Sequence, residues 1–264
     1  MPKVRLDTLM AQRGIFESRT RAAASIMAGE VRLGSAGERA QKPGQMVTED
    51  AVVSVDEAPR HVSRGGTKLA NALEALPVPV AGRRALDVGA STGGFTDHLL
   101  QQGASHVVAL DVAYGELSWK LRSDDRVTVL ERCNARSVTA DMLPYPPDLV
   151  VADVSFISLA KVLPAVLACA APRYDALLMV KPQFEVGRAL VGKGGVVREP
   201  ELRRSAVASV AAAAASCGAV VCGAAPSGLP GPKGNHETFL WLAEAGRDGA
   251  WDDVPAALAG VEGI

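Results

Sequence analysis

Four charged residues could together activate a hydroxyl group for attack: Lys68, Asp153, Lys181 and Glu237. An alcohol is a poor nucleophile at neutral pH, so a protein that uses one must remove its proton as the new bond forms. A lysine can be that base when burial and a neighbouring cation make its neutral form accessible. We predict that Lys181 is the base and that Lys68 is the neighbouring cation. Asp153 and Glu237 would stabilise the ammonium form of Lys181 and fix its orientation.

Each of these four side chains also has an ordinary structural interpretation. A surface lysine, or a carboxylate that caps a helix, is common at any single position. The set favours a site because all four lie near element ends that one sheet would bring to a single rim. The surrounding sequences are also unusual: SRGGTKL, DVSFIS, KPQFE and GPKGNHE.

The run DVGASTGGFT, residues 87–96, lies where a predicted strand turns into a helix. Nucleotide ligands bind at this end of parallel strands, and glycines let the backbone approach a ligand closely. The carboxylate of Asp87 suits a cationic or hydrogen-bond-donating group better than a pyrophosphate. The dinucleotide spacing G-x-G-x-x-G is missing from this run. These features favour S-adenosylmethionine over a dinucleotide.

Polar residues also follow the next two predicted strands. Asp111 is expected to accept hydrogen bonds from the two ribose hydroxyls, and Asn134 to contact the adenine edge. A strand-end Asp can instead cap a turn, and a glycine-rich loop can be a plain turn, but their order along successive strands favours a ligand. The predicted cofactor-binding residues are Asp87, Gly89, Ala90, Ser91, Gly93, Phe95, Asp111, Asn134 and Asp153.

From Arg83 onward, strand-like and helix-like segments alternate, which is typical of a doubly wound parallel sheet. We expect strands at 84–88, 107–111, 127–130, 148–153, 176–180, 219–222 and 238–242, and helices at 95–102, 117–122, 159–171 and 201–216. Seven strands fit a Rossmann-like α/β sheet that is mostly parallel, with the last strand antiparallel. Residues 205–225 carry no charge and are long enough for a membrane span. Their Ala, Ser and Gly content favours a helix that runs into a strand.

Residues 1–58 are predicted to form a separate, small α+β domain. An apolar stripe (Leu6, Leu9, Met10) indicates one helix, and Ser18 is a suitable N-cap for a second. The buried face of the second helix is expected to carry Ala22, Ala23, Ile26 and Met27. We place an interdomain linker at 59–63, the sheet domain at 64–247 and a tail at 248–264.

The composition excludes several classes of protein. The chain has 264 residues, 28 Lys+Arg and 29 Asp+Glu, which is typical of a folded domain and not of a disordered or fibrous chain. The four cysteines form no CxxC pair, so neither a metal site nor a disulfide framework is expected. The first residues contain no apolar run of signal-peptide length, and we therefore expect a cytoplasmic protein.

A net charge of −1 means that contacts with nucleic acid would have to come from local clusters of cations. Residues 1–58 are balanced, with eight basic and eight acidic residues, whereas residues 60–84 carry five basic residues against one acid. The candidates for RNA phosphate contacts are Arg5, Arg19, Arg21, Lys42, Arg60 and Arg64. The alternative interpretation of these side chains is a solvated helix end.

Several motifs carry a family resemblance. The pattern R-x-x-A-x-x-x-I-x-x-G-x-V from Arg19 to Val31, with the later KPG, resembles an S4-type RNA-binding domain. The K-D-K-E set resembles the catalytic tetrad of FtsJ-type ribose 2′-hydroxyl methyltransferases. With SRGxxKL, DxGASTGGFT, DVSFISL, VKPQFE and GPxGNxExF, residues 1 to about 243 resemble the TlyA (haemolysin A) family.

This resemblance implies methylation of a cytidine 2′-hydroxyl in ribosomal RNA, with S-adenosylmethionine as the methyl donor and no metal ion. It also implies that the N-terminal domain recognises folded RNA and that the linker couples RNA binding to cofactor binding. Two alternatives stay open because the N-terminal domain is not basic overall. One is an O-methyltransferase for a small-molecule hydroxyl or carboxylate, and the other is a non-enzymatic RNA-binding or haemolysin-like protein.

Overall fold

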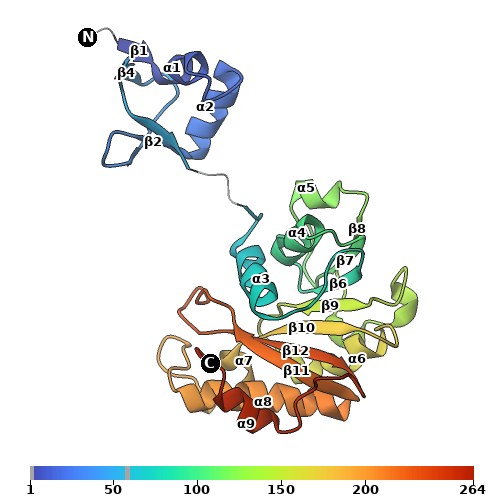
Figure 1. Cartoon of the computed structure of the whole chain (residues 1–264). Coiled ribbons are helices and arrows are strands. Elements are labelled where there is room, and N and C mark those ends of the chain that lie inside the picture. Colours follow the sequence, from blue (N-terminus) through green and yellow to red (C-terminus); the bar gives the residue numbers. More distant parts are fainter. Residues whose placement is uncertain (1–2, 57–59) are drawn as a thin grey trace. The chain divides into compact units, whose positions relative to one another are not determined.

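The computed structural model describes residues 3–56 and 60–264, which divide into two compact units, Met1–Arg60 and His61–Ile264. Figure 1 shows the helices and strands of each unit in chain order. The elements of the first unit are β1 (Lys3–Arg5), α1 (Leu6–Gln12), α2 (Arg19–Ala28), β2 (Val31–Leu33), β3 (Glu38–Arg39), β4 (Met46–Thr48) and β5 (Val53–Val55). Strands β1 and β4 form one small antiparallel sheet, and β3, β2 and β5 form another. Their core consists of apolar residues from both helices and from β2 and β4.

The limits of helix α2 follow its sequence. The Ser18 side chain accepts a hydrogen bond from the backbone N–H of Arg21, and Gly29 ends the helix with a left-handed φ of 79°. Ala22 and Ile26 are buried as expected, but the placement of Met27 in the same buried face was wrong, since 77% of its surface is exposed. Met27 lies about 100° around the helix from Ile26, so packing on one side covers Ile26 alone.

The second unit begins with α3 (Arg64–Ala75) and then alternates strands and helices. Its remaining elements are β6 (Arg84–Val88), α4 (Gly94–Gln101), β7 (His106–Leu110), α5 (Trp119–Arg122), β8 (Val127–Leu130), β9 (Leu149–Ala152), α6 (Leu163–Ala168), β10 (Asp175–Val180), α7 (Pro182–Glu185), α8 (Pro200–Ser216), β11 (Ala219–Pro226), β12 (Thr238–Glu244) and α9 (Val254–Ala259). Four short 3₁₀ segments lie at Ala135–Ser137, Ala140–Met142, Leu159–Lys161 and Arg188–Leu190.

The seven strands form one sheet in the order β11-β12-β10-β9-β6-β7-β8, in which β12 runs antiparallel to both of its neighbours. The predicted α/β class, the seven strands and the antiparallel last strand are therefore confirmed. Helices α3 and α4 bury their apolar side chains against one face of the sheet. Helices α6, α8 and α9 cover the other face, as Figure 1 also shows. The expected helix 159–171 is instead a 3₁₀ turn followed by the short α6.

The register of the sheet brings four segments to one edge. Strands β6, β9 and β10 run parallel, so the residues that follow their carboxyl ends, beginning with Gly89, Asp153 and Lys181, meet there. Strand β12 runs the other way, and its first residue, Thr238, pairs with Val180. The residue before β12, Glu237, therefore lies at the same edge as the residue after β10, Lys181.

The uncharged stretch 205–225 lies in α8 and β11, as the expectation of a helix running into a strand requires. Within 3–56 and 60–264, none of the helices combines the length and the apolar character that crossing a bilayer requires.

Residues 61–63 and 248–264 both pack onto the second unit. The ring of His61 is buried and its Nε2 lies 2.9 Å from Nδ1 of His98, and the backbone N–H of Val62 donates to Asp97. The part of the predicted linker from His61 to Ser63 therefore belongs to this unit, and residue 59 lies outside the described residues. At the other end, Leu258 and Ile264 are buried in the core that includes α8, so residues 248–264 are part of the domain and not a separate tail.

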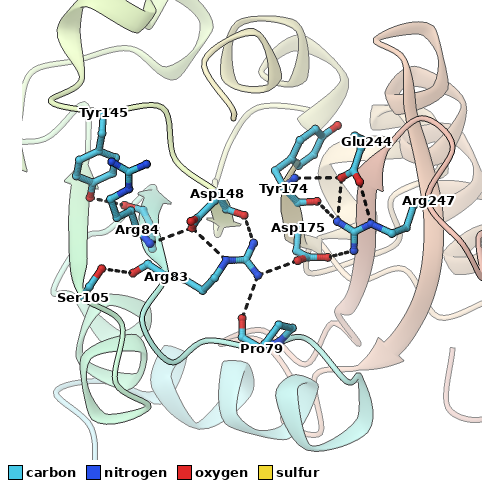
Figure 2. A network of polar contacts seen from close by, with 11 residues as sticks. Pro79, Arg83, Arg84, Ser105, Tyr145, Asp148, Tyr174, Asp175, Glu244 and Arg247 are labelled. Carbon is cyan, nitrogen blue, oxygen red and sulfur yellow. Dashed lines mark hydrogen bonds and ion pairs between the residues drawn. The ribbon is translucent and has the colours of Figure 1, made fainter. Parts of the chain in front are cut away.

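A network of ion pairs joins strands at the opposite edge of the sheet (Figure 2). The buried carboxylate of Asp175 accepts hydrogen bonds from Arg83 Nη1 at 3.0 Å, Arg247 Nη1 at 2.8 Å and the indole N–H of Trp241 at 3.0 Å. Arg83 also pairs with Asp148, and Arg247 pairs with Glu244. Side-chain bonds from Arg247 hold the pKa of Glu244 at about 2.

We expect Asp175→Asn to lower the free energy of unfolding by about 1–3 kcal/mol, since one amide cannot accept three donors and two of them are cations. Urea unfolding at neutral pH measures this change. Methyl transfer by the folded variant should equal that of the wild type, because Asp175 begins β10 at the edge opposite Lys181. An unfolding midpoint equal to that of the wild type would contradict a stabilising role for this network.

Candidate active site

The four predicted catalytic residues line one cavity of about 370 Å³, together with residues of the glycine turn. They form two ion pairs, one between Lys181 and Asp153 and one between Lys68 and Glu237. The expectation placed Glu237 as a second carboxylate on Lys181, but each lysine has its own carboxylate in the structure. Each cation is thereby neutralised locally while its polar head still borders the cavity.

Lys181 follows β10 and Asp153 follows β9, which is its parallel neighbour. The Lys181 Nζ lies 2.5 Å from Asp153 Oδ1 and donates a hydrogen bond of 2.8 Å to Ser155 Oγ. Asp153 and Ser155 therefore fix the direction of the lysine head group. The carboxylate also stabilises the ammonium that forms when Lys181 accepts a proton.

The Lys68–Glu237 pair is much more buried. Lys68 lies inside α3, and only 6% of its surface is exposed. Glu237 is 3% exposed. A Cβ at Gly231 would lie 2.7 Å from Glu237 Oε1, so the loop before β12 requires glycine where it passes this carboxylate.

Asp87 is fully buried at the end of β6. One of its oxygens accepts from the backbone N–H and the hydroxyl of Thr96, at 3.0 and 2.7 Å. The other, Oδ1, has no hydrogen-bond partner within residues 3–56 and 60–264, although Asp87 borders the cavity. Burial and, to a smaller extent, the charge of Asp153 raise the pKa of Asp87 to about 7 against the opposing effect of the Thr96 hydroxyl.

The glycine turn needs its glycines. Gly89 has a φ of +84° and a Cβ there would lie 2.5 Å from the backbone oxygen of Asp153, while Gly93 has a φ of +96° and its Cβ would meet the Leu121 side chain at 2.2 Å. Ser91, between them, has an unusual positive φ of 48° and its N–H donates to Asp111 Oδ2 at 2.8 Å.

Asp111 lies at the carboxyl end of β7 and borders a second cavity of about 460 Å³ with Gly89, Asn134 and Asp153. Its oxygens accept from the N–H groups of Ser91 and Ala113, which leaves further lone pairs on both for a ligand. Asn134 caps a 3₁₀ turn with its side-chain oxygen, which accepts from the N–H of Arg136. The side-chain NH₂ of Asn134 is therefore the group that remains for the predicted contact with adenine.

These residues fit a cationic nucleoside. Asp87, which has one carboxylate oxygen without a hydrogen-bond partner in the described part of the chain, borders the first cavity, and glycines keep the backbone open at the end of β6. Asp111 supplies acceptors of the kind that ribose hydroxyls require. Phe95 is buried and packs against Phe239, and it also borders the first cavity. Ala90 borders the first cavity.

An aromatic pair, Phe156 and Phe184, lies beside Lys181. Phe156 is 91% exposed, has a positive φ of 63°, and packs against Phe184 with ring centroids 5.4 Å apart. Both rings border a further cavity of about 380 Å³ that also includes Lys181 and Glu237. A large exposed aromatic ring in a strained backbone conformation is characteristic of a binding surface and not of a core.

The candidate RNA-contacting residues lie in both units. In the first unit, the buried carboxylate of Asp7 pairs with Arg5 Nη2 at 2.6 Å and lies 3.7 Å from Arg19 Nε. Arg21 and Lys42 are exposed. In the second unit, Arg64 borders the first cavity and donates to the backbone oxygen of Pro230 at 2.8 Å, and Arg60, at the end of the first unit, is exposed.

The sequence motifs alone did not predict a role for several residues near the site. Ser155 bonds to Lys181, Thr96 to Asp87, and Glu185 to the segment after Asp153. Their only sequence signal was membership of the motifs DVSFISL, DVGASTGGFT and VKPQFE. A hydrogen-bond partner is set by the pairing of distant segments, which one sequence does not show.

The chain is a methyltransferase of the FtsJ-like type joined to an S4 domain, as its matches to two family models show. Residues 61–244 match the family model of FtsJ-like methyltransferases, and residues 4–53 match the S4 domain model. The first match covers most of the chain. The expected Lys-Asp-Lys-Glu arrangement at one cavity is consistent with this class.

The chain belongs to the TlyA family of these methyltransferases. It is 52% identical over 242 residues to the 16S/23S rRNA (cytidine-2′-O)-methyltransferase TlyA of Mycobacterium tuberculosis, covering 91% of this chain and 90% of that one. It is 36% identical to the protein named Hemolysin A of Brachyspira hyodysenteriae, covering 89% and 97%. A solved structure described as a presumed hemolysin from Streptococcus thermophilus is 38% identical, with a TM-score of 0.72 over 98% of this chain and 95% of that one.

Proposed function

We propose that this methyltransferase transfers the methyl group of S-adenosylmethionine to a cytidine 2′-hydroxyl of ribosomal RNA in the cytoplasm. The observation that carries the proposal is the Lys181–Asp153 pair, at the junction of the cavities that contain Asp111 on one side and Phe184 on the other, with Phe156 bordering both cavities. The M. tuberculosis relative bears the name of this activity. When bound, the cofactor supplies an electrophilic methyl group on a sulfonium.

Lys181 provides the base. In its neutral amine form, its Nζ, held by Ser155 and Asp153, would accept the proton of the 2′-hydroxyl as that oxygen takes the methyl group. Asp153 stabilises the resulting ammonium. Lys68 and Glu237 fix α3 to the loop before β12 and so hold the wall of the cavity.

The surroundings of Phe156 suit a nucleoside acceptor. The exposed ring of Phe156 and the half-buried ring of Phe184 offer an aromatic face of the kind on which an unstacked base lies. A wider cavity of about 820 Å³ continues past them and is lined by Arg136, Lys161 and Arg188. Among the described residues, no acidic side chain lines it. These three cations suit the phosphates of neighbouring nucleotides.

Transfer of labelled methyl groups to purified ribosomal subunits, compared with transfer to a metabolite extract, tests this function. We expect the labelled methyl groups on cytidines of the RNA, so that the label remains after the ribosomal proteins are removed. If the protein makes six or more phosphate contacts, RNA affinity should fall by about 10³-fold or more between 50 and 200 mM salt. Label confined to the metabolite extract would replace this proposal by the small-molecule alternative.

Asp111→Ala should weaken binding of S-adenosylmethionine by roughly 10–100-fold, because it removes acceptors for the ribose hydroxyls. Isothermal titration calorimetry with the isolated protein measures this affinity. An unaltered dissociation constant would show that Asp111 does not contact the ribose. Asp124→Ala, which removes an exposed salt bridge to Arg126, is a suitable control.

Cofactor affinity should depend on the ionisation of Asp87. Its pKa near 7 means that the free carboxyl is largely protonated below that pH, and a cationic ligand favours the charged form. We therefore expect affinity to fall about tenfold for each pH unit below 7 and to be constant above it. The Asp87→Asn variant should bind more weakly and lose this pH dependence. A wild-type affinity that is flat between pH 5 and 7 would contradict contact between Asp87 and the cation.

A further inference from the structure

Two segments beside the proposed methyl-acceptor site run next to each other and are joined at three levels. At the first level, Lys181 contacts Asp153 and Ser155. At the second, the ring of Phe184 packs on that of Phe156. At the third, the carboxylate of Glu185 bonds to the residues that end the loop after Asp153. The motifs DVSFISL and VKPQFE therefore lie side by side and contact each other along their length.

The loop after Asp153, which contains Phe156, has a backbone conformation that its residues would not adopt alone. Phe156 has a φ of 63°, which is costly for a bulky side chain with a Cβ. Because 91% of its surface is exposed, burial contributes little to holding it there. Backbone strain of this kind persists only where the surrounding contacts fix the loop on both sides. Asp153 provides the contact on one side of Phe156.

Glu185 provides the contact on the other side. Its Oε2 accepts from the Ser158 hydroxyl at 2.6 Å and its Oε1 accepts from the backbone N–H of Leu159 at 2.9 Å. Ser158 in turn caps the 3₁₀ turn that follows, accepting from the N–H of Ala160 at 3.2 Å. Burial raises the pKa of the Glu185 carboxyl, while its two hydrogen bonds lower it.

We infer that Glu185 is a positioning residue for methyl transfer, which fixes the Phe156 loop against the segment that carries Lys181. Glu185 does not line the cavities that contain Lys181. Its effect passes through the two bonds to Ser158 and Leu159, which keep the aromatic ring at a set place relative to the base. This inference rests on the proposed function, because it concerns where the acceptor nucleoside is held.

Substitution of Glu185 tests the inference in labelled methyl transfer to ribosomal RNA. Glu185→Ala should lower kcat/KM for RNA by about tenfold or more, which corresponds to the loss of charge-assisted hydrogen bonds. Affinity for S-adenosylmethionine should be unchanged. Glu185→Gln should restore kcat/KM to within about threefold of the wild type, since the amide oxygen can accept from Leu159 and its N–H can donate to Ser158. Glu201→Ala, on the exposed side of α8, is the matched control.

A double-mutant cycle with Phe156→Ala separates positioning from a general loss of stability. If Glu185 acts through Phe156, adding Glu185→Ala to Phe156→Ala should change kcat/KM by less than about twofold. If the losses of kcat/KM in the two single variants multiply in full in the double variant, or if Glu185→Gln fails to restore activity, the positioning role is overturned. Should Glu185→Ala not fold, Glu185→Asp, which keeps the charge but shortens the reach, carries the same test.

The outcomes distinguish this inference from the function on which it rests. A wild-type protein that labels no RNA overturns the proposed function. A wild-type protein that labels RNA, with a Glu185→Ala variant as active as Glu201→Ala, overturns only the role of Glu185.

Discussion

Lys181→Ala is expected to lower kcat for methyl transfer by about 10²–10⁴-fold, the range in which a general base contributes. Without the amine, the hydroxyl proton has no acceptor held by Ser155 and Asp153 at the end of β10. Binding of S-adenosylmethionine should stay within about threefold of the wild type, since Asp87 and Asp111 keep their places. Single-turnover transfer to ribosomal RNA, with calorimetry for the cofactor, measures both quantities.

Lys181→Arg separates the proton-accepting role from the charge. The guanidinium keeps a positive charge beside Asp153 but does not lose its proton in the accessible pH range. We expect this variant to be folded, to bind cofactor and to be nearly as inactive as Lys181→Ala. Turnover close to that of the wild type in either variant would remove Lys181 from the proton transfer.

The second large effect is expected for Lys68→Met. This substitution leaves the carboxylate of Glu237, which is 3% exposed, buried without its partner. Breaking a buried ion pair from one side costs about 3–5 kcal/mol of unfolding free energy, although the carboxyl can lower that cost by taking up a proton. We therefore expect the unfolding midpoint to fall sharply and methyl transfer to be lost. Urea unfolding at pH 7.5 and at pH 5.5 measures the change, which should be smaller at the lower pH.

Removal of both partners distinguishes the stability of the pair from its function. Lys68→Met combined with Glu237→Gln should recover most of the lost stability, because no unpaired charge is then buried. Methyl transfer should not return, since the cavity has lost both polar groups. A double variant that is as unstable as Lys68→Met would show that the pair is not the source of the effect. Recovered activity would exclude a role of the pair in the reaction.

Much of the fold could be predicted from local patterns. Buried strands such as β9 and residues 176–180 of β10 are continuous apolar runs, and the glycine turn after β6 marks where a helix begins. Helix α2 begins and ends where Ser18 and Gly29 predict, because capping depends on neighbours in the chain. The side of helix α2 that faces the core was harder to predict, as Met27 shows, because it depends on which distant elements pack against the helix.

By itself, the sequence determined the chemistry that is present: two lysines, two carboxylates, a glycine turn with an acid before it, and an S4-like unit. The position of such residues at the ends of successive strands can be read from the chain itself. A parallel sheet then gathers all of its carboxyl ends at one edge, so these residues are expected to lie near one another. Only the tertiary structure decided which lysine meets which carboxylate. The antiparallel β12 places Glu237 at the end of β10, yet helix α3 brings Lys68 to it, so Lys181 pairs with Asp153 instead. Such partners are separated by up to 169 residues in the chain, and packing between distant elements alone brings them together.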